Sequence, residues 1–396
     1  MSTTSETSAE QLVADRCDQL LAEHDPSSMP GREFLGHQFD AGLAWVHFPE
    51  GRGGLGLGPK LQPEINRRLA DAGAPNAMMR NPIGHGMGAP TVVTHGSDEQ
   101  QTRYLRPLFT GEEVWCQLFS EPGAGSDVAG LATRAVQDGD EWVVNGQKVW
   151  TTLAHRARWG MLVARTNPDQ PKHRGLTYFV IDMEQPGVEV RPLRQMTGEA
   201  EFNEVYFTDA RVPDVERLGD VGDGWRVSLT TLMNERVAIG GTVPQRGSGT
   251  IAMAVETWTK RGGTAEQRDR LLSLWSRAEV LRLTNIRASQ NRKSGVPGPE
   301  GSVGKLASAE LNQEITSFNL ELLGPEAMTY GRYDLGQPET AMAMSSPQKA
   351  FLRTRANSIE GGTTEVMKNI LGERVLGLPG DVRTDKDIPW IDVPRN

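Results

Sequence analysis

The segment that carries the most information about the fold is Gln117–Leu118–Phe119–Ser120–Glu121–Pro122–Gly123–Ala124–Gly125–Ser126–Asp127. A strand-like run enters this segment and ends in a glycine-rich turn. Glycines let backbone N–H groups approach a ligand closely, and serine hydroxyls supply hydrogen-bond donors. Such a turn would suit a phosphate-bearing or heteroaromatic ligand. It is not a Walker motif, and taken alone it is better interpreted as an ordinary tight turn.

Short strand-like runs continue on the C-terminal side of this segment. They are β-branched or aromatic and are bounded by turn residues: Trp142–Val144, Lys148–Trp150, Trp159–Ala164 and Leu176–Ile181. Asn145–Gly146 separates the first two runs and predicts a β-hairpin. Asp138–Gly139–Asp140 predicts another turn, and the strands end near residues 209–213.

Helical patterns flank the strands on both sides. Ser8 with Gln11, and Ser97 with Gln100, have the spacing of capping boxes, and the second pair predicts a helix that ends near residues 110–111. Further helices are expected around an apolar stripe from Leu271 to Leu281, over 300–323, and after Gly361–Gly362. This order predicts an α+β fold: an N-terminal α-helical domain over 1–113, a middle β domain over 114–225 and a C-terminal α-helical bundle over 226–396.

Composition limits the function classes. The 396 residues include 42 Lys+Arg and 51 Asp+Glu, a formal net charge of −9. An acidic chain without a basic run does not favour nucleic-acid or anionic-membrane binding. No apolar stretch approaches the ~20 residues of a transmembrane helix, and no signal peptide is recognisable. Two cysteines exclude a disulfide framework, so we expect a reducing, cytoplasmic location.

Three further segments could take part in chemistry. In Lys148–Thr152, a Trp beside two hydroxyls could stack on a flat ring system and bond to it. In Glu235–Arg236, a carboxylate among apolar helix residues could become a tuned base. Glu360–Glu365 opens a helix behind two glycines, an arrangement that can bind an anion. Each also has a purely structural interpretation: a core Trp, a surface ion pair and a helix cap. The histidines lack metal-ligand spacing, so no metal site is expected.

The order and spacing of these segments together are more specific than any one of them. The chain resembles the acyl-CoA dehydrogenase family over nearly its whole length. The resemblance rests on Phe119–Asp127, Asn145–Thr152, Gly361–Glu365 and Arg374–Pro379. It implies the family fold, in which a β-barrel domain stands between an N-terminal helical domain and a C-terminal helical bundle.

The resemblance also implies a flavoprotein with FAD held between the β domain and the C-terminal helices. The segment from Gln117 to Ser126, which includes Phe119 and Gly125, would line the flavin and the acyl-CoA. Ser120 would bond the flavin ring, and Ser126 would lie near both flavin and CoA. The other implied cofactor contacts are Trp150, Thr151, Thr152, Thr363 and Glu365, and the other implied substrate contacts are Arg236 and Gly361.

The implied reaction is α,β-dehydrogenation of an acyl-CoA thioester to the trans-2-enoyl-CoA, with electrons passed to an electron-transfer flavoprotein. A carboxylate must remove the α-proton, and two glutamates are candidates. Some family members carry the base in the C-terminal loop, but matching that motif here puts Gly361, not Glu360, at the base position. Others place a Glu before an Arg on the helix after the β domain, which Glu235–Arg236 fits. We therefore favour Glu235 over Glu360.

Two departures from the family concern the remote part of the cofactor. The usual Arg-Phe-Gly of the C-terminal helices is absent, and 321–327 replaces a Gln-x-x-Gly-Gly-x-Gly element. Both leave the adenine and pyrophosphate contacts and the oligomer packing open, although the family suggests a homotetramer or dimer. Two alternatives also stay open: a flavin-dependent monooxygenase or oxidase on the same fold, and a non-catalytic CoA-binding partner subunit. The type of acyl chain is not predicted.

Overall fold

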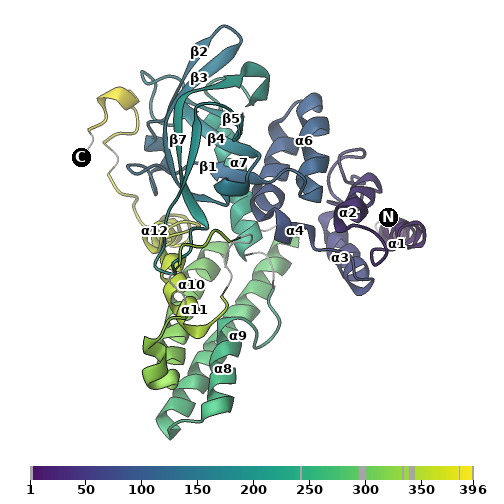
Figure 1. The fold of residues 1–396 in the computed structure, drawn as a ribbon, viewed down its shortest axis with the longest axis vertical. Coiled ribbons are helices and arrows are strands. Elements are labelled where there is room, and N and C mark those ends of the chain that lie inside the picture. Colours follow the sequence, from purple (N-terminus) through teal and green to yellow (C-terminus); the bar gives the residue numbers. More distant parts are fainter. Residues whose placement is uncertain are drawn as a thin grey trace. The chain divides into compact units, whose positions relative to one another are not determined.

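The computed structural model describes residues 3–240, 243–293, 300–331, 334–338, 344–382 and 384–394, without the side chains of 3–7, 235–240, 292–293 and 300. The chain divides into two compact units (Figure 1). Unit 1 comprises Met1–Arg191, Phe202–Leu232 and Asp385–Asn396, and unit 2 comprises Pro192–Glu201 and Met233–Thr384. Each unit is described by itself below.

Helices open unit 1. They are α1 (Thr3–Glu23), α2 (Gly31–Asp40), α3 (Gln62–Asp71), α4 (Ala77–Arg80), α5 (Ala89–His95) and α6 (Asp98–Thr110). The predicted capping box before α6 is confirmed: the Ser97 hydroxyl accepts from Gln100 N–H, and Gly111 ends the helix with φ 68°. The predicted box at Ser8 is wrong, because α1 begins at Thr3 and Ser8 lies inside it.

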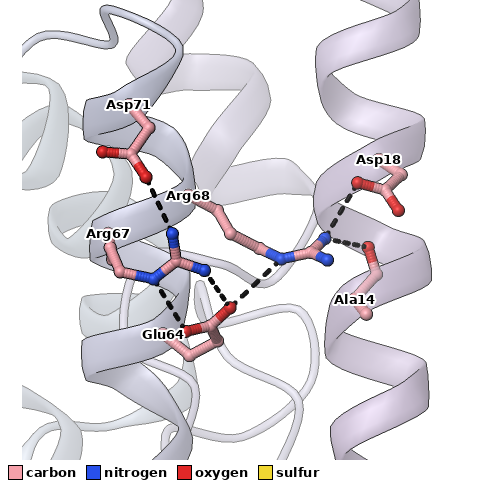
Figure 2. Close-up of polar contacts among 6 residues, drawn as sticks. All are labelled: Ala14, Asp18, Glu64, Arg67, Arg68 and Asp71. Atoms are coloured by element: carbon pink, nitrogen blue, oxygen red, sulfur yellow. Dashed lines mark hydrogen bonds and ion pairs between the residues drawn. The ribbon is translucent and has the colours of Figure 1, made fainter.

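Helix α1 is held on α3 by an apolar seam and by charges at its edge. Val13, Cys17 and Leu20 of α1 are buried in one cluster with Ile65 and Leu69 of α3. Figure 2 shows the charged edge, where the Arg68 guanidinium reaches across from α3 to the Asp18 carboxylate (2.8 Å) and the Ala14 carbonyl (3.2 Å) of α1. By contrast, the ion pairs of Arg67 with Glu64 and Asp71 stay within α3.

The strands of unit 1 form one sheet. They are β1 (Trp115–Leu118), β2 (Arg134–Asp138), β3 (Glu141–Thr152), β4 (Trp159–Arg165), β5 (Leu176–Asp182), β6 (Val188–Pro192, whose last residue belongs to unit 2), β7 (Phe202–Pro213) and β8 (Arg217–Leu218). The pairing order is β6–β7–β3–β2–β4–β5–β8, and β1 pairs in parallel with β4. The predicted turn at Gly139 is confirmed as the β2–β3 hairpin, where Gly139 has φ 67°. Closure of this sheet into a barrel stays a prediction.

The predicted hairpin at Asn145–Gly146 is wrong. Strand β3 runs straight through these residues, and its pairing with β7 shifts register between Val144 and Gly146. The Asn145 side chain bonds Asp209 of β7 in both directions, donating to its carboxylate (2.9 Å) and accepting from its N–H (3.0 Å). A Cβ at Gly146 would stand 2.7 Å from Thr133 Cα, so the glycine permits close backbone approach rather than a chain reversal.

Helix α7 (Gly224–Gly240) starts in unit 1 and ends in unit 2, where α8 (Thr250–Arg261), α9 (Ala265–Lys293) and α10 (Glu300–Leu323) follow. Apolar residues from α8, α9 and α10 share one core: Ile251, Ala254, Leu271, Leu274, Leu311, Ile315, Phe318 and Leu322. Helices α11 (Pro347–Thr354) and α12 (Thr364–Arg374) complete unit 2. The predicted helix over 300–323 is confirmed. Helical N- and C-terminal regions therefore flank a central sheet, as the sequence predicts.

Candidate functional site

The glycine-rich segment of unit 1 forms a tight turn directly after β1. Glu121 and Ala124 exchange two backbone hydrogen bonds of 3.0 Å, and the exposed residues Gly123, Gly125 and Ser126 form the outer side of the segment. Ser120 is half-buried, and its carbonyl accepts the N–H of Val149 from β3 (2.9 Å). The structure therefore brings together the two predicted ligand-binding segments, 117–127 and 148–152.

A buried ion pair fixes this junction. Lys148 is fully buried, and its ammonium donates to the Glu121 carboxylate and to the Phe119 carbonyl, both at 2.9 Å. The same carboxylate accepts the N–H groups of Ala132 (2.6 Å) and Thr133 (2.9 Å). Burial alone would raise the pKa of Glu121, but Lys148 and these donors outweigh it and hold that pKa below its ordinary value. The turn is therefore tied at one point to β3 and to the start of β2.

Gly123 lies at the tip of the turn, and Gly125 directly follows it. A Cβ built at Gly123 or Gly125 would meet nothing within 4 Å among the described residues, and neither glycine has a positive φ. Neither packing nor backbone conformation thus explains the glycines. A flat or phosphate-bearing ligand lying directly on the backbone would explain them, because a Cβ would fill that space.

Trp150 lies near the end of β3 in an unusual conformation. Its side chain is 58% exposed, and its φ of 60° lies in the left-handed region. Its ring meets Phe202 edge-on, with centroids 5.8 Å apart. A large exposed aromatic held in a left-handed conformation costs roughly 1–3 kcal/mol, and such strain gathers at ligand sites. This geometry fits a ring that stacks on a ligand better than a core tryptophan.

The neighbouring predicted cofactor contacts have different environments. Thr151 is buried, and its hydroxyl finds no hydrogen-bond partner in the described part of the chain. Thr152 and Gln117 are half-buried, the latter within β1 opposite Met161 of β4. The Phe119 side chain lies in the core, edge-on to Tyr178. Phe119 therefore leaves only its backbone near the turn, and its predicted cofactor contact stays a prediction.

In unit 2 the candidate loop before α12 is organised by an arginine. The Arg353 guanidinium donates to both oxygens of Glu360 (3.0 and 2.8 Å) and lies 3.0 Å from the Glu201 carboxylate. Asn357 also donates to Glu360 (2.8 Å). Arg353 is 5% exposed, so this is a nearly buried cluster of charges. Glu360 is therefore already engaged by structural partners.

The rest of this loop caps the helix. Gly361 and Gly362 have φ values of 64° and 95°, which only glycine adopts freely. The Thr363 hydroxyl accepts from Val366 N–H (3.2 Å), and Glu365 lies in the first turn of α12, as expected for a helix N-terminus. Lys305 of α10 donates to the carbonyls of Asn357 (2.8 Å) and Gly362, so the loop is bound to α10.

The favoured base and its neighbour lie at the edge of what the structure describes. Glu235 and Arg236 belong to the helical backbone of α7, but their side chains lie outside the described residues. Their roles, like those of Gly361, Thr363 and Glu365, stay predictions.

Three charged residues organise these segments without having been assigned a role from the sequence. Glu121 and Lys148 lie within motifs that the sequence analysis describes. The sequence feature that points to Lys148 is a charged residue in a strand that otherwise carries many apolar side chains. Arg353 was not recognised because one of its partners, Glu201, lies far from it in sequence and the other, Glu360, seven residues away, meets it only through the fold of the loop before α12.

Three domain models of one protein family match successive parts of the chain. Domain models described as acyl-CoA dehydrogenase N-terminal, middle and C-terminal domains match residues 4–112, 116–210 and 222–376. IpdE1 of Mycobacterium tuberculosis, an acyl-CoA dehydrogenase, is 37% identical over 350 residues, which are 87% of this chain and 86% of IpdE1. The chain belongs to the acyl-CoA dehydrogenase family. It is therefore an enzyme of the oxidoreductase class, and the family implies a flavin cofactor.

Two further relatives extend this comparison. FadE34 of Mycobacterium tuberculosis, also an acyl-CoA dehydrogenase, is 40% identical over 349 residues, which are 86% of this chain but only 45% of FadE34. This chain thus spans about half the length of FadE34. The crystal structure of the ChsE4–ChsE5 complex from the same organism contains a similar chain, with 28% identity, a TM-score of 0.69, and coverage of 94% of this chain and 98% of that one.

Among the residues that the structure describes, no helix is both long and apolar enough to cross a membrane. Within the same residues, no cluster of three or more His, Cys, Asp or Glu side chains could hold a metal ion.

Proposed function

We propose that this enzyme uses FAD to dehydrogenate an acyl-CoA thioester to the trans-2-enoyl-CoA and passes the electrons to an electron-transfer flavoprotein. The observation that carries the proposal is the turn after β1. Gly123 and Gly125 leave open space that a Cβ would occupy, and Trp150 is exposed in a left-handed conformation. This combination suits a flat ring system laid on the backbone.

The residues present fit the flavin. Ser120, Ser126, Trp150, Thr151 and Thr152 would hold it from unit 1, by hydroxyl and backbone donors and by ring stacking. Bound FAD supplies the hydride acceptor for the β-carbon. Thr363 and Glu365 are also proposed as cofactor contacts. We also propose that the sheet closes into the family's barrel.

The protein's own task in this chemistry is to remove the α-proton and to stabilise the charge that develops on the thioester carbonyl. We propose Glu235 as the base. Glu360 accepts from Nη1 and Nη2 of Arg353 and from the amide of Asn357, so its oxygens are already occupied by donors. These hydrogen bonds favour a structural role for Glu360 in the loop before α12. Arg236, Ser126 and Gly361 are proposed to contact the substrate.

The choice of base is testable under anaerobic conditions. Glu235→Gln should retain FAD but abolish bleaching of the flavin by acyl-CoA, because the amide cannot accept the α-proton. Glu360→Gln should still bleach, because it changes a structural pair. If Glu235→Gln bleaches at the wild-type rate and Glu360→Gln does not, the base is Glu360.

Two other functions lead to different results. The ChsE4–ChsE5 structure is a complex of two named chains, and this chain lacks the family's Arg-Phe-Gly element, so a role as one member of a mixed oligomer is a second candidate. A chain that purifies without yellow colour and binds flavin only with a second chain would favour that role. Rapid reoxidation of the reduced enzyme by air, without an electron-transfer flavoprotein, would favour a monooxygenase or oxidase.

Assembly is proposed on the same basis. We propose a homo-oligomer, a tetramer or a dimer, and sedimentation of the purified chain measures this directly. A panel of straight, branched, aromatic and steroid-derived acyl-CoA thioesters, assayed with a dye acceptor, identifies the acyl group.

A further inference from the structure

The C-terminal segment Asp385–Pro394 returns to unit 1 and packs beside the glycine-rich turn. Its backbone is anchored at three places on the loop after β4: Pro389 bridges Pro171, Trp390 N–H donates to the Gln170 carbonyl (2.9 Å), and Ile391 N–H donates to the Pro168 carbonyl (3.0 Å). A terminal segment held by repeated backbone bonds has a fixed position, so its side chains can act on their neighbours.

Trp390 contacts the residues that directly follow the turn. Its indole N–H donates to the Gly130 carbonyl (3.1 Å), and its ring lies under the Arg165 guanidinium, 4.6 Å from it. Arg165 in turn donates to the carbonyls of Ala129 (2.6 Å) and Leu131 (3.2 Å). Three consecutive carbonyls are therefore held by one stacked pair of side chains. Trp390 is 9% exposed, which shields these bonds from water.

A second anchor lies at the other end of the same stretch. The Lys172 ammonium bridges Asp127, the last residue of the glycine-rich segment (2.8 Å), and Asp385, the first residue of the C-terminal segment (2.5 Å). Its side chain is 11% exposed, so the bridge is partly protected from solvent. The C-terminal segment thus supports the stretch 127–131 directly, through the bond from Trp390 to Gly130, and indirectly, by contacting the Lys172 and Arg165 side chains that themselves bond this stretch.

We propose that Asp385–Pro394 is a positioning strap for the proposed FAD-binding turn, with Trp390 and Asp385 as its positioning residues. The part that concerns FAD rests on the proposed function, whereas the mechanical part does not. Loss of the strap removes the Trp390 bond to Gly130 and the contacts that hold the Arg165 and Lys172 side chains, which loosens 127–131, while the Glu121–Lys148 pair still holds the start of the turn. The strap therefore tunes FAD affinity rather than the fold.

The test compares hydrogen exchange in the full-length protein, with its bound FAD, for wild type and for Trp390→Ala, Trp390→Phe and Asp385→Asn. The reporters are the N–H groups of Gly130 and Leu131, which close turns onto Asp127 and Val128. Loss of an indole hydrogen bond and a cation–π contact should speed their exchange roughly tenfold. Trp390→Phe keeps a ring over Arg165 and should have an intermediate effect. The dissociation constant of FAD should rise in the same order, with kcat at saturating FAD little changed.

The matched control is Ile391→Ala, a residue of the same segment whose side chain is 56% exposed and whose anchoring bond is made by the backbone. It should behave as wild type. Unchanged exchange at 127–131 in Trp390→Ala would overturn the strap, and so would faster exchange that extends equally to α6. If the wild-type chain proves to bind no FAD, the proposed function fails, and the exchange comparison still decides the strap.

Discussion

The buried Lys148–Glu121 pair gives the sharpest test of how the site is built. In Lys148→Met, a side chain of similar length fills the space but leaves the Glu121 carboxylate, which is 8% exposed, without its ammonium. The Phe119 carbonyl also loses its donor. Breaking a buried pair costs roughly 3–5 kcal/mol. Because Ala132 and Thr133 still donate to Glu121, we expect the lower end, about 3 kcal/mol.

This loss can be measured by urea and thermal unfolding. For a folded unit of ordinary size, about 3 kcal/mol corresponds to a fall in Tm of roughly 6–12 °C. The control is Lys260→Met, the same change in an exposed helix pair with Glu256, which should leave the free energy of unfolding nearly unchanged. In Glu121→Gln/Lys148→Met, the amide can still accept one backbone N–H, so the double variant should lose less than the two single losses added together.

The pH dependence has a definite sign. Since the folded-state pKa of Glu121 lies below its ordinary value of 4.5, its stabilising contribution is fully present above that pH. It is lost as the pH falls further, through the lowered folded-state pKa. The stability gap between wild type and Lys148→Met should therefore shrink under acid conditions. A Lys148→Met protein within 1 kcal/mol of wild type at neutral pH would refute this account of the site.

Other substitutions separate ligand binding from folding. Gly125→Ala should leave Tm within about 1 °C, because its Cβ meets open space, yet weaken FAD binding at least roughly tenfold; a normal FAD affinity would contradict the assignment of the turn. Glu360→Gln should lower stability by roughly 1–3 kcal/mol, because Arg353 is nearly buried, while flavin reduction continues; unchanged urea unfolding would contradict it. Arg68→Ala should lower the free energy of unfolding by only about 0.2–1 kcal/mol, and by less at high salt. The loss should exceed that of Arg67→Ala, whose ion pairs stay within α3; equal losses would show that Arg68 does not secure α1.

The elements that follow from the sequence are those with strong local signals. The capping box at Ser97 and the helix over 300–323 needed only side chains close to them in sequence. The hairpin predicted at Asn145–Gly146 is wrong because the same dipeptide occurs in hairpin turns and in bulges. Only the pairing with the partner strand β7 decides between the two.

The candidate site also has parts that local sequence predicts and parts that it does not. Local motifs predict the turn and the Trp150 segment, but they do not predict the charged residues that hold these segments in place. Lys148 meets Glu121 across 27 residues, and Trp390 meets Gly130 across 260. Contacts at such separations depend on the tertiary fold, so no local pattern predicts them. The side chain of Glu235, the proposed base, lies beyond the described residues.

The most direct measurement mixes purified, FAD-loaded enzyme with acyl-CoA thioesters in the absence of oxygen and follows flavin absorbance together with enoyl-CoA formation. Wild type should bleach with at least one thioester and form one trans-2-enoyl-CoA per flavin, but never with pivaloyl-CoA, which has no α-hydrogen. Glu235→Gln should retain FAD, and the thioester should reduce its flavin roughly 10²–10⁴-fold more slowly than that of the wild type. Wild-type enzyme that holds FAD yet is reduced by no thioester would contradict the proposed dehydrogenation.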